Sequence, residues 1–319
     1  MSTSTPTYFF YNPTQAHAKI DAEVQAALAE DIGSGDLTAQ LIPQNTPVTA
    51  AILVREEAVI CGIDWVNACF KQVDKNTQID WQVSEGEKVS PNQVLCHIRG
   101  DARSLLTAER CALNFLQTLS ATATQTRRYV DAIAGTQANI LDTRKTIPHF
   151  RFAQKYAVRV GGGENQRFAL YDGILIKENH IAAAGSIEKA LKQAVELNSQ
   201  KSIQIEVENI TQLKEALTAG ATSILLDNFD IPLLKKAVTL NKTLQSPAIL
   251  EASGGITLKN VREIAETGVD RISIGSITKN ILAIDLSMRI LHWHFYPQVW
   301  TIKPPHQTLI FHFLEANWL

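Results

Sequence analysis

The chain has 319 residues, of which 45% are apolar and 19% are charged, a balance typical of a globular protein with a sizeable core. Its 30 basic and 32 acidic residues leave a formal net charge of −2. Such a charge provides no broad field for nucleic acid or an anionic membrane, so the sequence argues against both partners and any anion site must be local.

The four cysteines and the N-terminal segment indicate a cytoplasmic protein. Cys61, Cys69, Cys96 and Cys111 show no C-x-x-C spacing, which favours reduced thiols. Residues 1–15 lack a basic region and a long apolar run, so we expect no signal peptide. No apolar stretch has the length needed to span a membrane.

The first part of the chain has a mixed α and β pattern. A helix is predicted at 20–29, strands at 49–54, 58–61 and 78–83, and a long bridging helix at 108–134. We therefore predict an N-terminal α/β sandwich domain over 1–120, which residues after 285 could complete. An open, incomplete α/β barrel with the active site should follow over 121–284, and 285–319 forms a C-terminal segment with an unassigned aromatic-rich tail.

Six strand and helix units define the expected barrel. Short apolar strands are predicted at 138–141, 173–176, 203–207, 223–226, 248–250 and 271–274. The intervening helices show one apolar face, which favours a parallel sheet with helices outside. Residues 143–170 form a long connection after the first strand, and such connections are often functional.

Polar residues follow the strands where an active site of such a barrel lies. These residues are Thr143, Arg144, Lys145, Lys177, Glu206, Glu208, Asp227, Ser253, Gly254, Gly255, Gly275 and Ser276. The two glycine-containing turns precede helices, where backbone N–H groups and the helix dipole favour phosphate. The alternative is that the charged residues only form salt bridges.

The basic residues predict a second anion site. Arg144, Lys145, Arg167 and Lys177 form a cluster suited to a polyanion, and the planar fork of arginine matches carboxylates. The glycines at 161–163 could let the backbone pass close to a ligand. Glu206 and Asp227 could either hold Mg²⁺ together with substrate phosphates or pair with the lysines.

Together these motifs resemble the quinolinate phosphoribosyltransferase family, in order, from Glu30 to about Ser287. The motifs are Glu109-Arg110 with Asn114, Asp142-Thr143-Arg144-Lys145-Thr146, Lys155-Tyr156-Ala157-Val158 with Gly161-Gly162-Gly163, Lys177-Glu178-Asn179-His180, Glu206-Val207-Glu208 and Glu251-Ala252-Ser253-Gly254-Gly255. The resemblance implies transfer of phosphoribosyl from phosphoribosyl pyrophosphate to quinolinate with decarboxylation, in NAD biosynthesis. It also implies a homodimer or higher homo-oligomer with shared active sites.

The resemblance further implies a role for each site residue. An arginine matching Arg110 reaches in from the partner subunit, and Arg144 and Arg167 match the groups that grip the carboxylates. The catalytic residues of the family match Lys145, Lys177, Glu206 and Asp227. Of these, the residues matching Glu206 and Asp227 bind the ribose hydroxyls and Mg²⁺. The phosphate-binding turns match Ser253, Gly254, Gly255, Ile274, Gly275 and Ser276, and Thr143 also belongs to the substrate site.

The chain departs from the family pattern at two places. The family loop usually reads G-G-G-x-N-H-R, whereas Gln166 stands here before Arg167, and glutamine carries no charge. The family also usually ends soon after Ser287, so residues 290–319 are additional.

Three rival functions remain open on the sequence. A relative acting on nicotinate would need fewer arginines than Arg110, Arg144 and Arg167, so a dianionic acceptor is favoured. A Schiff-base aldolase would use Lys145 or Lys177, and borohydride trapping would reveal it. A lipoyl-type carrier built on residues 77–100 would show a modified lysine by intact mass.

Overall fold

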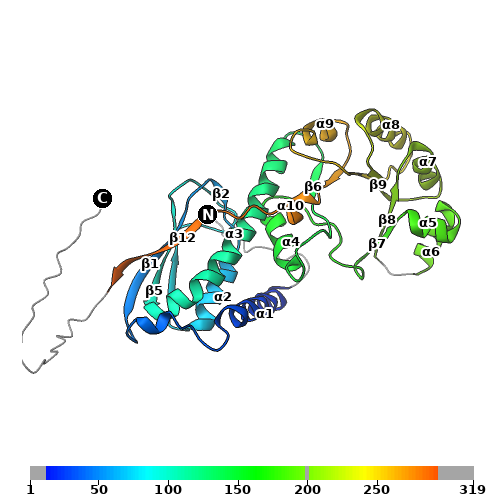
Figure 1. Cartoon of the computed structure of the whole chain (residues 1–319). Helices are drawn as coiled ribbons and strands as arrows, with labels where there is room; N and C mark the ends of the chain where they lie inside the picture. The colour runs from blue at the N-terminus through cyan, green and yellow to red at the C-terminus, as the bar shows by residue number, and fades with distance from the viewer. Residues whose placement is uncertain (1–11, 198–200, 294–319) are drawn as a thin grey trace, which may run out of the picture.

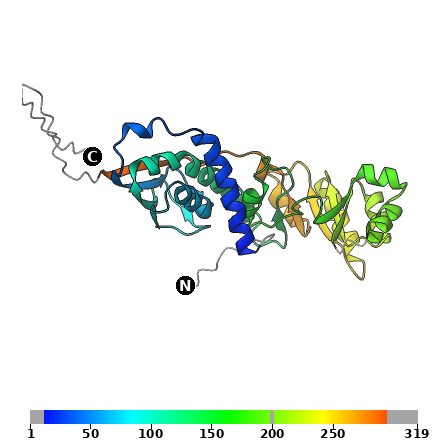
Figure 2. The same cartoon turned by 90° about the horizontal axis from the view of Figure 1, so that it is seen from below.

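The computed structural model describes residues 12–197 and 201–293, which form two lobes joined by one long helix (Figure 1). The view from below places the N-terminal lobe and the far end of the parallel sheet at opposite ends of the molecule (Figure 2). The predicted fold class, an open α/β barrel beside a smaller α/β sandwich, is confirmed.

The N-terminal lobe contains a four-stranded antiparallel sheet in the order β12-β1-β5-β3. Strand β12 comes from the end of the described chain and pairs with β1, so distant segments build one sheet. A small β2-β4 ribbon and the short helix η1 complete the lobe. Its elements are α1 (Pro13–Ile32), η1 (Ala39–Leu41), β1 (Pro47–Val54), β2 (Ala58–Val59), α2 (Ile63–Val73), β3 (Gln78–Trp81), β4 (Lys88–Val89), β5 (Val94–Asp101) and β12 (Leu286–Trp293).

Local signals explain where the two longest helices begin. The Asn12 side chain accepts a hydrogen bond from the backbone N–H of Gln15, and the Gln15 side chain accepts one from the backbone N–H of Asn12. Pro13 occupies the first turn of α1. The Asp101 side chain caps α3 (Ala102–Ala132) by accepting hydrogen bonds from the backbone N–H groups of Arg103 and Ser104. Helix α3 spans both lobes and is buried along much of its length.

The second lobe is built on six parallel strands in the order β6-β11-β10-β9-β8-β7. Strands β6 and β7 are the two edges of this sheet, so the barrel stays open between them. Its elements are β6 (Asn139–Leu141), α4 (Arg151–Val160), β7 (Gly173–Ile176), α5 (Glu178–Ala184), α6 (Ile187–Glu196), β8 (Ser202–Val207), α7 (Ile210–Thr218), β9 (Ser223–Asp227), α8 (Ile231–Lys242), β10 (Ile249–Ser253), α9 (Val261–Glu266), β11 (Arg271–Ser273) and α10 (Ser276–Lys279).

The register of this sheet aligns the strand ends that carry the polar residues. Ser253 lies opposite Asp227 on one side and opposite Ser273 on the other, and Ser273 also faces Leu141. Because neighbouring strands are parallel and in step, their carboxyl ends meet at one edge. The chain segments that follow β6, β9, β10 and β11 therefore converge there.

The connection predicted over 143–170 is not a simple loop. It contains α4, whose aromatic residues pack on the N-terminal lobe: the ring centroids of Trp65 and Phe152 lie 5.8 Å apart, and those of Trp65 and Tyr156 lie 5.4 Å apart. The apolar residues Phe152, Tyr156 and Val160 recur at helical spacing, a signal that the sequence prediction did not use, whereas the burial of Gln154 and Lys155 has no such signal. Helix α4 thus ties the active-site edge to the other lobe.

The prediction that the glycines at 161–163 approach a ligand is wrong. A Cβ on Gly161 would lie 2.6 Å from the carbonyl oxygen of Ala123, and one on Gly163 would lie 2.9 Å from the Thr126 side chain. Both Ala123 and Thr126 belong to α3. Glycine is required there because the backbone passes close to a helix, not because it passes close to a substrate.

The cysteines, the helices and the tail of the chain bear on three further expectations. All four cysteines are buried free thiols, as predicted. Within 12–197 and 201–293, no helix has both the length and the apolar character to cross a bilayer. Residues 290–293 lie in β12, and the rest of the aromatic-rich tail falls outside the described residues.

Candidate active site

A cavity of about 750 Å³ opens at the carboxyl edge of the parallel sheet. This volume lies within the range of small-molecule sites. The structure brings nearly all of the predicted site residues together in its wall, and these are Thr143, Arg144, Lys145, Arg167, Lys177, Glu206, Asp227, Ser253, Gly254, Gly255, Ile274, Gly275 and Ser276. Arg110 and Glu208 do not line the cavity.

Several other side chains of the cavity wall were not predicted as site residues from the sequence. Polar examples are Gln166, Asn228, Glu251, Thr257, Ser273, Lys279 and Asn280. Two of them had a usable signal. Glu251 is a carboxylate flanked by Leu250 and Ala252 in a buried strand, and Lys279 follows Ser276 by three residues, which brings both to one face of a helical turn.

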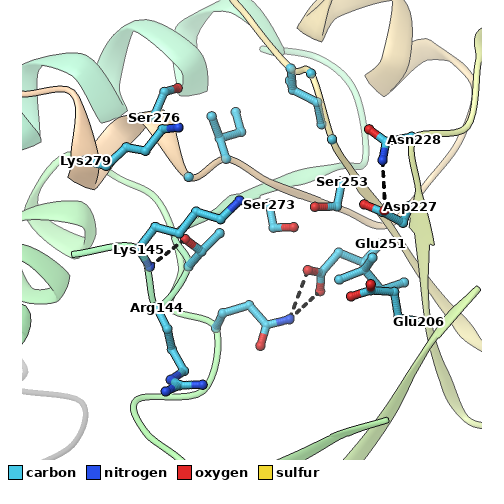
Figure 3. A pocket seen from close by; sticks show the side chains of 18 of the residues that line it. Arg144, Lys145, Glu206, Asp227, Asn228, Glu251, Ser253, Ser273, Ser276 and Lys279 are labelled. Carbon is cyan, nitrogen blue, oxygen red and sulfur yellow. Dashed lines mark hydrogen bonds between the residues drawn. The ribbon is translucent and has the colours of Figure 1, made fainter. Parts of the chain in front are cut away.

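Most of the basic side chains lie on one side of the cavity, whereas Lys177 reaches the carboxylate of Glu206 on the other. Figure 3 shows Arg144, Lys145 and Lys279 opposite the acidic side chains Glu206, Asp227 and Glu251. The Arg167 guanidinium donates to the carbonyl oxygen of Gly173 at 2.9 Å. Burial and then the neighbouring charge of Arg144 lower the pKa of Arg167 from its ordinary value. Two guanidinium groups therefore repel each other here, and an anion bound between them would relieve that repulsion.

Arg144 has donor capacity to spare. Its Nε atom is buried, and the described part of the chain supplies no hydrogen-bond acceptor for it. A buried donor without a partner is unfavourable by about 1–3 kcal/mol. A carboxylate ligand would satisfy this donor, since guanidinium groups bind carboxylates through paired N–H groups.

The acidic side chains have distinct partners. Glu206 accepts from the Lys177 ammonium at 2.9 Å, so pairing with a lysine, one of the two alternatives for the carboxylates, is present at this residue. Asp227 accepts from the side-chain amide of the adjacent Asn228 at 2.8 Å. Both carboxylates keep free lone pairs toward the cavity, since a carboxylate has about four acceptor positions.

Glycine is required at two turns of the wall. Gly254 has φ +97°, and a Cβ there would lie 2.1 Å from Oδ1 of Asn228; Gly255 follows with φ +63°. A Cβ on Gly275 would lie 2.8 Å from the side chain of Lys145. The turn after β11 is therefore shaped around Lys145, and the Ser276 hydroxyl beside it is buried without a hydrogen-bond partner among the described residues.

A buried ion pair lies directly behind the cavity. Lys155 of α4 donates to Asp142, which follows β6, and both side chains are almost fully buried. Burial raises the pKa of Asp142 and lowers that of Lys155, while their mutual attraction opposes both changes. Neither residue lines the cavity, but both hydrogen-bond to the backbone of Gln166, which does.

Two family models cover most of the chain. The model described as the N-terminal domain of quinolinate phosphoribosyl transferase matches residues 36–120, and the model described as its C-terminal domain matches residues 122–289. The chain belongs to the quinolinate phosphoribosyltransferase family. The resemblance found in the sequence motifs is thereby confirmed.

Individual members of this family are similar over most of their length. A probable nicotinate-nucleotide pyrophosphorylase (carboxylating) of Bacillus subtilis is 39% identical over 277 residues, which is 86% of this chain and 94% of that protein. A quinolinate phosphoribosyltransferase (decarboxylating) of Nicotiana tabacum is 37% identical, over 86% of this chain and 84% of that protein. The solved nicotinate-nucleotide pyrophosphorylase of Francisella tularensis superposes with a TM-score of 0.81 at 46% identity, covering 86% and 96% of the two chains.

Arg110 is the family-predicted residue that this chain does not bring to its own cavity. It lies on α3, and its side chain is exposed. Gln166, the departure from the family's usual histidine, is in the wall, where its amide nitrogen donates to both oxygens of Glu251 at 2.9 Å.

Proposed function

We propose that this chain transfers phosphoribosyl from phosphoribosyl pyrophosphate to quinolinate and releases carbon dioxide, giving nicotinate mononucleotide and pyrophosphate in NAD biosynthesis. The observation that carries the proposal is the two-sided cavity, in which a basic wall faces a row of carboxylates beside two glycine-shaped turns. Membership of the quinolinate phosphoribosyltransferase family supports the same reaction.

The basic wall binds the dicarboxylate. Arg144 and Arg167 hold the two adjacent carboxylates of quinolinate, and Lys145 and Lys177 add positive charge. The lowered pKa of Arg167 and the unpartnered Nε of Arg144 support this assignment, because both features are relieved by an anion. Arginine suits the task because its planar fork matches a carboxylate.

The glycine-shaped turns bind phosphate groups. Residues 253–255 and 274–276 form the turns at the ends of β10 and β11, beside Lys145 and Lys279. The N–H of Ile274 donates to the carbonyl oxygen of Leu141 at 2.9 Å, so in the second turn the N–H groups of Gly275 and Ser276 are the candidates for phosphate. The free hydroxyl of Ser276 gives a further donor. Convergent N–H groups and lysines form an anion-binding concavity, which holds the phosphates so that the reacting carbon lies near the pyridine nitrogen.

The carboxylates act where positive charge develops. As pyrophosphate leaves C1 of the ribose, that carbon becomes cationic, and Glu206 and Asp227 stabilise it and hold the ribose hydroxyls. The pyridine nitrogen attacks in line. The ring nitrogen then carries a positive charge, which stabilises the electron pair left on C2 when the C2–carboxylate bond breaks and carbon dioxide departs. C2 then takes up a proton from solvent, which gives nicotinate mononucleotide.

Mg²⁺ fits the acidic side of this cavity. Glu206 and Asp227 line the same wall, and Mg²⁺ binds through one or two carboxylates together with substrate phosphates. Among the described residues no group of three or more His, Cys, Asp or Glu forms a metal cage, which leaves the donor set as two carboxylates and the substrate. When bound, the metal neutralises the leaving pyrophosphate. We expect a chelator to abolish turnover and added Mg²⁺ to restore it; full turnover in excess chelator would contradict this assignment.

Arg110 completes the site of a neighbouring subunit. Its exposed position on α3, outside the cavity of its own chain, supports a homodimer with shared active sites. A third guanidinium from the partner would close the basic wall around the dianion and exclude water.

The test is a reaction of the protein with quinolinate, phosphoribosyl pyrophosphate and Mg²⁺, followed by chromatography for nicotinate mononucleotide. The proposal predicts that this nucleotide forms only when all three components are present. Borohydride should trap no adduct on Lys145 or Lys177 with carbonyl substrates. Absence of the nucleotide together with such an adduct would replace the proposal by the aldolase alternative.

A further inference from the structure

The polar groups of Gln166 are all engaged within the protein. Its backbone N–H donates to Asp142 at 2.9 Å, and its carbonyl oxygen accepts from Lys155 at 2.9 Å. Its side-chain nitrogen donates to both oxygens of Glu251 and to Oε1 of Gln204, at 2.8–2.9 Å. Its side-chain oxygen accepts from the backbone N–H of Arg167 at 3.0 Å. No hydrogen-bonding hydrogen of Gln166 is left for a ligand.

The backbone of Gln166 is held by charged groups that do not reach the cavity. Asp142 and Lys155 form an ion pair whose side chains are 0% and 1% exposed. Asn165 adds donors to Asp142 at 2.5 Å and to the Lys155 carbonyl oxygen at 2.9 Å. A buried pair of this kind is rarely favourable for stability alone, so a positioning role accounts better for its presence.

The side chain of Gln166 reaches the opposite side of the barrel. Glu251 is fully buried in β10, and its oxygens accept from the amides of Gln166 and Gln204. Within 12–197 and 201–293 no basic side chain forms a salt bridge with Glu251. Gln166 therefore joins the segment after α4 to strand β10 through the carboxylate of Glu251, which accepts hydrogen bonds from the neutral amides of Gln166 and Gln204.

Arg167 is the residue that this arrangement fixes. Its backbone N–H donates to the side-chain oxygen of Gln166, and its guanidinium donates to the Gly173 carbonyl oxygen at 2.9 Å, so both its backbone and its guanidinium are held. We propose that Gln166 is a positioning residue that sets Arg167 for the acceptor's carboxylates and does not itself bind the acceptor. This inference rests on the proposed function, because it assigns how quinolinate is held.

The amide chemistry of Gln166 matters to this role. Glutamine supplies two donors toward Glu251 and Gln204 and one acceptor toward Arg167 at the same time. A neutral imidazole has one donor and one acceptor, and a protonated one has two donors and no acceptor. Histidine, the family's usual residue at this position, could therefore make only part of the same set of bonds.

The experiment is a double-mutant cycle on quinolinate binding, measured by calorimetry without the second substrate. Gln166→Met keeps the length of the side chain and removes its hydrogen bonds. We expect it to raise the dissociation constant for quinolinate at least about tenfold, the equivalent of about 1.4 kcal/mol, while the KM for phosphoribosyl pyrophosphate changes less than about twofold. Gln193→Met, the same change on the exposed face of α6, is the matched control and should alter neither value.

The cycle separates positioning from direct contact. In an Arg167→Ala background, Gln166→Met should weaken quinolinate binding by less than about twofold, because the group it positions is gone. If the factors by which Gln166→Met and Arg167→Ala raise the dissociation constant multiply in the double variant, Gln166 contacts quinolinate itself and the inference is wrong. If Gln166→Met raises the dissociation constant for quinolinate and the KM for phosphoribosyl pyrophosphate by the same factor, Gln166 has only a general structural role, which would also overturn the inference.

A second variant covers the outcome in which Gln166→Met does not fold. Gln204 contacts Gln166 and Glu251 from β8 but does not line the cavity, so it cannot be a ligand. Gln204→Met should also raise the quinolinate dissociation constant selectively, and an unchanged value would contradict the inference. If the wild-type protein neither binds nor turns over quinolinate, the proposed function is wrong. If the wild-type protein is active but the effects of Gln166→Met and Arg167→Ala are independent, only this inference is wrong.

Discussion

Removing one carboxylate from the acceptor tests the basic wall most sharply. Nicotinate lacks one of the two adjacent carboxylates of quinolinate, so one guanidinium of the pair Arg144 and Arg167 would lose its partner. Truncating one member of a buried, hydrogen-bonded charge pair costs about 2–5 kcal/mol. Both arginines are only partly buried, so the lower part of this range applies. About 2.7 kcal/mol corresponds to about a hundredfold.

We therefore expect kcat/KM for quinolinate to exceed that for nicotinate by at least about a hundredfold, by the same estimate. Arg144→Ala and Arg167→Ala should each lose most quinolinate turnover and retain the fold, since both residues lie in loops. The control is Arg262→Ala on α9, where the guanidinium pairs with Glu266 outside the cavity. Comparable rates with nicotinate and quinolinate would refute the reasoning and leave a phosphoribosyltransferase of other specificity.

Three further predictions concern stability, phosphate binding and the oligomer. Burial raises the pKa of Glu23 to about 7, so between pH 4.5 and 7 the folded state holds a proton that the unfolded state has lost. The unfolding free energy should therefore fall as pH rises through this window, by about 2 kcal/mol relative to Glu23→Gln, as urea denaturation at pH 5 and 8 would measure. Equal pH dependence of both proteins would contradict this. Gly254→Ala should raise the KM for phosphoribosyl pyrophosphate at least about tenfold because the turn must move; Gly220→Ala, with φ +81° and open space, should lower stability and leave that KM unchanged. Mixing inactive Arg110→Ala with inactive Lys145→Ala should restore activity, because a mixed dimer has one site with both residues intact; no recovery after proven subunit exchange would place Arg110 outside the partner's site.

The strands and the residues at their ends could be predicted because their signals are local. Short apolar runs ended in Thr143–Lys145, Lys177, Glu206 and Asp227, and parallel strands place such ends at one edge. The side chains then met in one cavity as expected.

What could not be predicted depends on contacts between distant segments. The burial of Gln154 and Lys155 on α4 could not be predicted, because their side chains hydrogen-bond to Ile147, Thr278 and Gln166 in other segments of the chain. Gly161 and Gly163 have no sequence signal that distinguishes contact with α3 from contact with a ligand. Gln166 was recognised as a departure, but its partner Glu251 lies 85 residues away.

The most direct test of the account uses quinolinate labelled with carbon-13 in the carboxylate at C2, next to the ring nitrogen. With phosphoribosyl pyrophosphate and Mg²⁺, we expect all of the label to appear as carbon dioxide, in a one-to-one ratio with nicotinate mononucleotide and pyrophosphate. No label should be released when phosphoribosyl pyrophosphate is omitted, because the ring accepts electrons only after its nitrogen is alkylated. Label retained in the nucleotide, or released without the phosphoribosyl donor, would contradict the account.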